Sequence, residues 1–302
     1  MFAGTLVAAG TSSSFNRAVL PYLSFERMYQ GPLRATRPPL MSNVRHSMAA
    51  KPPSHSYPTL AAIAALAFIV ACVSHEAVGH GGMCIAIGGH VTLLTSVYFR
   101  CATGGPVTDA AGPLMNLAVG AGLYKVLHMR RSLSADWRLF LALAMAFNLL
   151  WGAGYFIFSA VTNTGDWAFV LRGLALQPSW LWRCLIGVLG VFLYYRSLAL
   201  IALHLRPGTP LVVPYLVAGA VSCAAALFFA GPVLPAVREA AQQSLGAAVG
   251  LLWLAYRNSS RAESQSSAML VDHSNGWLLV SALVTLGFVA SFGRGFAVGG
   301  HP

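Results

Sequence analysis

Long apolar stretches separated by short polar connectors dominate the chain from residue 57 onward. A helix needs about 20 mainly apolar residues to cross a bilayer. Stretches that approach or reach this length are 58–80, 107–127, 138–162, 180–204, 210–230, 236–256 and 276–293. The sixth carries Arg238 and Glu239 in its first third, and the last is short. The pattern predicts an all-α polytopic membrane protein with about six to seven transmembrane helices.

Two segments depart from this helical pattern. Residues 91–99 (VTLLTSVYF) are rich in β-branched and aromatic side chains, which predicts a short strand or hairpin after the first helix. Residues 1–56 are rich in Ser, Pro and Arg, which predicts a disordered basic segment, either a targeting sequence or the product of a misassigned start. The expected organisation is therefore this segment, a three-helix core over 57–176, and carboxy-terminal transmembrane helices of no assigned role over 177–302.

Composition supports an integral, multi-pass location in the lipid bilayer. Of the 302 residues 57% are apolar and 9% charged, whereas soluble proteins carry about 25% charged residues. The net charge of +11 comes from scattered basic residues without a nucleic-acid-binding motif, so no nucleic acid partner is expected. Basic residues mark cytoplasmic connectors. Four basic residues lie between the second and third spans, and the amino-terminal tail is also basic, so we expect both segments in the cytoplasm. The first and third connectors would then lie on the opposite face of the membrane.

The five cysteines are odd in number, dispersed and without a Cys-x-x-Cys pair. We expect most of them to be small apolar packing residues.

Three acidic residues fall within or at the ends of the predicted spans: Glu76, Asp109 and Asp166. An ionised side chain at the centre of a membrane helix costs about 2.5–3.5 kcal/mol on insertion scales, so such residues are functional candidates. The order of the spans brings all three acids to one face of the membrane.

The first acid lies between two histidines, in residues 74–82 (SHEAVGHGG). In the zinc-protease motif His-Glu-x-x-His, two imidazoles four residues apart bind one zinc ion and the Glu acts on the bound water. Here the histidines are five residues apart, which separates them by roughly 140° around a regular helix. A one-residue π-bulge would restore a common face. We therefore predict a wide turn near Gly79; in a regular helix His75 and His80 would instead be buried polar residues bonded to neighbouring helices.

At this point the chain resembles the site-2 protease family of intramembrane zinc metalloproteases, over residues 57–167. Residues 75–80 (HEAVGH) resemble that family's His-Glu-x-Gly-His with one residue inserted, and residues 111–116 (AGPLMN) resemble its Ala-Gly-Pro-x-x-Asn. Asn148-Leu149-Leu150 followed by Gly165-Asp166 is similar to its Asn-Leu-Leu-Pro…Asp-Gly. Trp151 stands where the family has Pro, and the gap from Asn148 to Asp166 is longer than usual.

The resemblance implies an intramembrane zinc endopeptidase that cuts transmembrane protein substrates. His75, His80 and Asp166 would bind one zinc ion, with water in the fourth position and Glu76 as general base. Because ligand bonds to zinc are about 2 Å long, the Asp166 carboxylate should lie within about 5 Å of both imidazoles. The family usually keeps its site toward the cytoplasm, whereas the basic connectors place this one on the other face.

Other polar residues have alternative roles. Asp109 is either the third ligand or a first-turn acid at a helix amino terminus. Asn116 and Asn148 either contact substrate or support the site by bonding between helices. The whole site also has two non-proteolytic interpretations: a structural metal site or proton or metal path in a non-catalytic membrane protein, or a degenerate family member that binds transmembrane clients without cutting them.

Overall fold

The computed structural model describes residues 56–130, 132–205, 208–262 and 271–296, within one compact unit over Pro52–Pro302. The predicted basic segment 1–56 lies outside these residues except for Ser56. The described part is mostly helical. Its helices are α1 (Tyr57–Val73), the π-helix η1 (Ser74–Gly81), α2 (Gly82–Ala86), α3 (Pro106–Met129), α4 (Ala135–Thr162), α5 (Asp166–Gly173), α6 (Ser179–Ala202), α7 (Val212–Ala226), α8 (Val233–Ala262), α9 (Asn275–Phe288) and the π-helix η2 (Val289–Gly293).

Every predicted span is helical, but the number of spans is not confirmed. Among the described residues four helices are long and apolar enough to cross a membrane: Tyr57–Ala86, Ala135–Thr162, Ser179–Ala202 and Asn275–Gly293. Three of the predicted stretches fall short of this standard. α7 has only 15 residues, and polar or charged side chains interrupt α3 and α8. The structure therefore supports four candidate spans where the sequence predicted six to seven.

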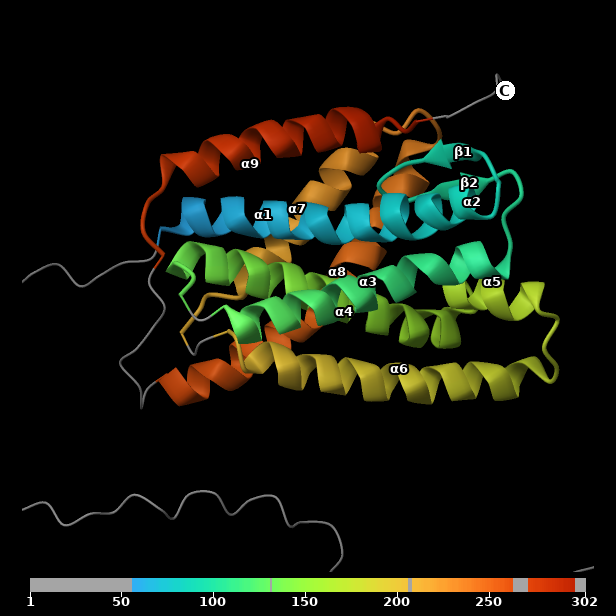
Figure 1. Cartoon of the computed structure of the whole chain (residues 1–302), viewed down its shortest axis with the longest axis horizontal. Coiled ribbons are helices and arrows are strands. Elements are labelled where there is room, and N and C mark those ends of the chain that lie inside the picture. The colour runs from blue at the N-terminus through green and yellow to red at the C-terminus, as the bar shows by residue number, and fades with distance from the viewer. Residues whose placement is uncertain (1–55, 131, 206–207, 263–270, 297–302) are drawn as a thin grey trace, which may run out of the picture. The chain divides into compact units, whose positions relative to one another are not determined.

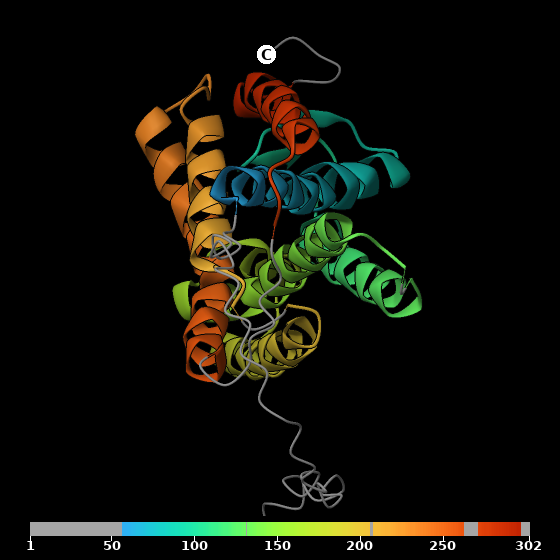
Figure 2. The ribbon, with the colours of Figure 1, turned by 90° about the vertical axis from the view of Figure 1, so that its left-hand side faces the viewer.

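Helix α4 forms the centre of the described bundle. It packs against α1, α3, α6 and α8, and its middle is buried on all sides, with Leu143, Met145 and Leu150 fully enclosed. α1 lies between α4 and α9 (Figure 1), and its continuation η1 packs against α3. α7 and α8 pack against each other and cover one side of these helices (Figure 2). This packing fixes η1, which continues α1, against α3.

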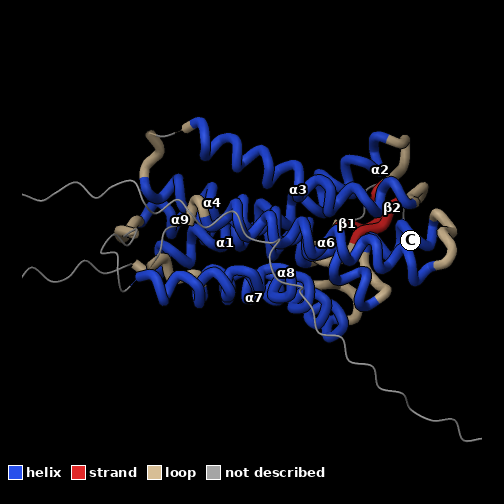
Figure 3. The backbone as a smooth tube through the Cα atoms, turned by 90° about the horizontal axis from the view of Figure 1, so that it is seen from below, coloured by secondary structure: helices blue, strands red, loops and turns tan. Residues whose placement is uncertain are grey.

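A two-stranded antiparallel sheet, β1 (Val91–Leu94) and β2 (Phe99–Cys101), lies at one end of the helices (Figure 3). It follows η1 and α2 in the chain and confirms the strand or hairpin predicted over 91–99. On its other edge, β1 forms a bridge between Leu94 and Phe296. The hairpin therefore lies at the end of the bundle where η1 carries the two histidines.

A disulfide joins Cys84 on α2 to Cys101 on β2. The sequence did not predict this pair, which forms because the hairpin returns β2 to α2. The other three cysteines, Cys72, Cys184 and Cys223, are free thiols. The disulfide fixes the hairpin to the helix segment that follows the histidines.

Candidate metal centre

The histidines lie in a π-helical segment, which confirms the wide turn predicted near Gly79. η1 covers all of Ser74–Gly81, so both His75 and His80 fall within it. Their Nε2 atoms are 3.2 Å apart and their ring centroids 4.8 Å apart. The widened turn thus brings two imidazoles five residues apart to the same side of the helix.

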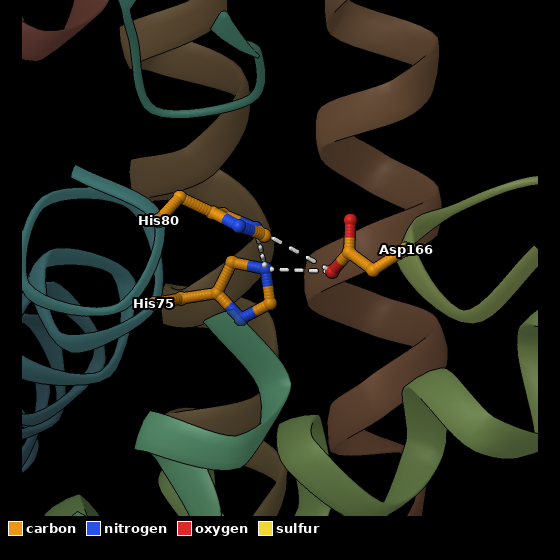
Figure 4. A group of neighbouring side chains, drawn as sticks. All are labelled: His75, His80 and Asp166. Carbon is orange, nitrogen blue, oxygen red and sulfur yellow. Dashed lines mark hydrogen bonds and ion pairs between the residues drawn. The ribbon is translucent and has the colours of Figure 1, made fainter. Parts of the chain in front are cut away.

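Asp166, the first residue of α5, faces the two histidines across the site (Figure 4). Its Oδ2 atom lies 3.1 Å from Nε2 of His75 and 3.6 Å from Nε2 of His80. The preceding Gly165 has φ +79°, a conformation that favours glycine and turns the chain into α5. The predicted proximity of the Asp166 carboxylate to both imidazoles is confirmed.

Both imidazoles are oriented by hydrogen bonds from their Nδ1 atoms. Nδ1 of His75 donates to Oδ1 of Asn116 (2.6 Å), and Nδ1 of His80 donates to the carbonyl of Thr108 (2.8 Å). Nδ2 of Asn116 donates to the carbonyl of Ala71 and to Oδ1 of Asn148, which turns its own Oδ1 toward His75. Asn116 and Asn148 therefore have the supporting role predicted as one of two alternatives.

These bonds place the proton of each neutral imidazole on Nδ1 and leave a lone pair on each Nε2. Two lone pairs and a carboxylate oxygen then converge, and Oδ2 of Asp166 is buried without a hydrogen-bond donor. A metal ion or a proton between them would complement such a set of acceptors.

The spacing of the three atoms fits a zinc ion. Ligand atoms about 2 Å from a tetrahedral zinc ion are separated by about 3.3 Å. The three separations here are 3.1, 3.6 and 3.2 Å. A single proton would bridge one pair and leave the third atom unpaired, so the near-equal spacing favours a metal ion over a proton.

A cavity of about 530 Å³ opens beside the three ligand candidates. Glu76 lines it and is only 3% exposed. Asp109 also lines it from the first turn of α3, but the group of side chains close enough to share an ion consists of His75, His80 and Asp166. The geometry thus favours Asp166 over Asp109 as the third ligand.

One face of α3 is shaped to receive the imidazoles. Thr108, Gly112 and Asn116 follow at intervals of four residues, so they lie on one side of the helix. Thr108 and Asn116 accept hydrogen bonds from the two histidines. Between them, a Cβ at Gly112 would collide with the His80 ring and lie 2.8 Å from Nε2 of His75. The glycine of the Ala-Gly-Pro segment is therefore required by close approach.

Aromatic rings enclose the histidines and were missed as site residues in the sequence. Trp151 stacks on His75 with centroids 5.4 Å apart, and Phe99 of β2 stacks on His80 at 5.3 Å. Tyr155 lies 5.0 Å from His75. Of these three aromatic residues, only Trp151 could have been identified as a site residue from the sequence, because it directly follows Asn-Leu-Leu.

No protein-family model matches the chain, and no curated protein or solved structure is similar to it. The resemblance to site-2 proteases therefore depends on the residues quoted above and on the geometry of this site.

We predict that Gly112→Ala weakens zinc binding at least tenfold, because the new methyl group displaces the imidazoles, and perturbed ligand support typically costs 10–100-fold in affinity. Competition with a fluorescent chelator measures the affinity. Gly122→Ala, on the same helix but with open space around it, is the matched control and should bind zinc like the parent. Equal affinities for both variants would contradict the proposed arrangement.

We further predict that Asp166→Ala weakens zinc binding by more than about 100-fold, beyond the effect typical of groups that only support ligands. Asp109→Ala should change the affinity by less than about tenfold, because Asp109 lines the cavity outside the group of three. Metal analysis of both purified variants ranks the two acids, and the reverse ranking would transfer the ligand role to Asp109.

Proposed function

We propose that this protein is an integral, multi-pass membrane zinc endopeptidase of the site-2 protease type. The observation that carries the proposal is the convergence of two imidazole lone pairs and a buried carboxylate oxygen beside Glu76 in an accessible cavity. The four long apolar helices support the membrane location. A purely structural metal site needs no neighbouring carboxylate in a cavity, which makes the catalytic function the better account.

In this proposal His75, His80 and Asp166 hold one zinc ion, which supplies Lewis-acid polarisation and lowers the pKa of a coordinated water to about 7. Glu76 accepts the proton from the attacking water and returns it to the departing amine. Asn116 and the Thr108 carbonyl keep both Nε2 lone pairs directed at the ion. Trp151 and Phe99 restrict water around the imidazoles.

We propose membrane-embedded substrates because an apolar cavity of about 350 Å³ adjoins the metal cavity. Residues of α4, α6 and α8 line it, and Tyr155 and Gln243 border both cavities. A transmembrane segment of a substrate would lie in this apolar cavity and pass Tyr155 to reach the zinc ion. The apolar lining of a cavity next to the metal site supports a transmembrane occupant.

The substrate backbone must unwind before it is cut, since helical carbonyls are engaged in hydrogen bonds. An extended segment can then add to a sheet edge. The outer edge of β1 is already bridged by Phe296, so the open edge next to the site belongs to β2. β2 also carries Phe99 against His80, which would place the bound segment beside the metal.

We predict that Glu76→Gln retains zinc but cuts a transmembrane substrate about 10²–10⁴-fold more slowly, because it removes the general base and no metal ligand. Cleavage is followed by gel mobility or mass spectrometry in detergent. Asp136→Asn, at the first turn of α4 and outside the cavity lining, is the control and should cut normally. A parental rate for Glu76→Gln would favour the non-catalytic metal site or ion path.

We also predict that Gly246→Phe slows cleavage of a transmembrane substrate by about tenfold or more and leaves the rate of cleavage of a short soluble peptide unchanged. Gly246 lines the apolar cavity, and open space surrounds the position of its Cβ, so the ring fills the path without a backbone clash. Gly122→Phe adds the same ring at another open glycine, outside that lining, and should spare both substrates. Equal loss for both substrates would assign the effect to the zinc site instead of the path.

A further inference from the structure

Basic side chains gather at the end of the bundle opposite the metal centre. α3 and α6 end there and α4 begins there, whereas the hairpin lies at the other end (Figure 1). His128 comes from the last turn of α3, Arg138 from the first turn of α4, and His204 from the residues that directly follow α6. We call these three residues the basic cluster, and the proposed mechanism gives none of them a role.

Tyr124 holds the two histidines of the cluster next to each other. It lies one turn before His128 on α3, and the two rings stack with centroids 6.1 Å apart. The Tyr124 ring also meets the His204 ring edge-on, at 5.4 Å. Tyr124 is half-buried and packs against the hydrophobic core. The fold therefore fixes both imidazoles at this place, although they come from helices that are far apart in the sequence.

The electrostatic potential at the cluster is positive. Burial and the charges of Arg138 and His128 lower the pKa of the His204 imidazole, and a neighbouring positive charge has this effect. Asp136 lies in the same turn of α4 as Arg138 but does not contribute to this shift. An anion bound among the three side chains would thus be stabilised.

Apolar and aromatic side chains accompany the cluster. Leu203, next to His204, is 71% exposed, and Met129, next to His128, is 67% exposed. Trp137 and Trp277 contact each other at the same end of the bundle, with ring centroids 5.1 Å apart. Such aromatic residues mark the boundary between the hydrocarbon core and the headgroups of a membrane. A ligand with an anionic head and an apolar tail matches these surroundings.

We propose that His128, Arg138 and His204 bind the phosphate of an anionic phospholipid of the cytoplasmic leaflet. The basic connector between α3 and α4 favours a cytoplasmic location for this end of the bundle. Anionic lipids give that leaflet its negative surface potential, and basic groups between membrane helices bind their headgroups. The bound lipid would link the ends of α3, α4 and α6. This inference does not depend on the proposed proteolytic function.

Native mass spectrometry of the purified full-length protein tests the lipid preference. The protein is released from mixed micelles that contain equal amounts of phosphatidylglycerol and phosphatidylcholine with the same acyl chains, and the bound lipids are identified by mass. The parent should retain phosphatidylglycerol at least about fivefold over phosphatidylcholine, the effect of one basic side chain beside an anionic headgroup. Arg138→Gln should lower this preference by about fivefold.

Substitutions of His128 alter the charge of the cluster without touching the core, because this side chain is exposed. His128→Glu should lower the preference for phosphatidylglycerol about fivefold, and His128→Lys should raise it by a similar factor. His90→Glu and His90→Lys are the matched controls. His90 is exposed, directly before β1 at the other end of the bundle, so the same changes in net charge should leave the preference unaltered.

Equal retention of the two lipids by the parent would overturn the proposal, and so would an unchanged preference in both His128 variants. Equal shifts in the His90 variants would assign the effect to the net charge of the protein and also overturn the site. Glycerol 3-phosphate, added as a soluble competitor, tests the source of the phosphate. If it displaces phosphatidylglycerol at equal concentration, the cluster binds a soluble phosphate compound and the lipid is the wrong ligand.

Discussion

The site depends on the close contact between the widened turn of η1 and the face of α3. Five-residue spacing brings His75 and His80 together only if the helix that carries them is widened, and a π-turn places that widened backbone against α3. A Cβ at Gly79 would lie 2.7 Å from Cα of Gly112, so neither glycine can carry a side chain there. With the two backbones in contact, Thr108 and Asn116 reach the Nδ1 atoms of both histidines. The inserted residue in the motif and Gly112 on the facing helix are therefore both needed for this close contact.

Two unrelated features bear on the side of the membrane that the proposed site would face. The basic connector between α3 and α4 favours a cytoplasmic location for that end of the helices, and therefore the opposite face for the hairpin. The disulfide between Cys84 and Cys101 lies beside the hairpin, and disulfides persist in oxidising compartments. Both favour a site on the non-cytoplasmic face, unlike the usual arrangement of the family it resembles. The disulfide also keeps β2, and with it Phe99, against His80.

Local features of the sequence predicted more of the site than of the bundle. The spacing of His75 and His80 and the flexibility of Gly79 predicted the π-turn, because backbone geometry depends on nearby residues. The proximity of Asp166 to the histidines was predicted from the order of the three motifs that resemble the site-2 protease family. The Thr108 carbonyl could not be predicted, because a backbone acceptor has no residue type to read, and the pairing of Cys84 with Cys101 required the path of the hairpin. The number of spans is not confirmed, because only four helices of the described residues are both long and apolar enough to cross a membrane.

The departure from the family pattern at Trp151 explains both the long gap to Asp166 and the second cavity. Without a proline after Asn-Leu-Leu, α4 continues unbroken to Thr162. Asn163 and Gly165, both with positive φ, then reverse the chain into α5, and Asp166 reaches the histidines from there. The added turns of α4 carry Gly154, Tyr155 and Phe158, which form one wall of the apolar cavity with α6 and α8. The extra helix length that separates Asp166 from the Asn-Leu-Leu segment therefore also builds one wall of the apolar cavity beside the site.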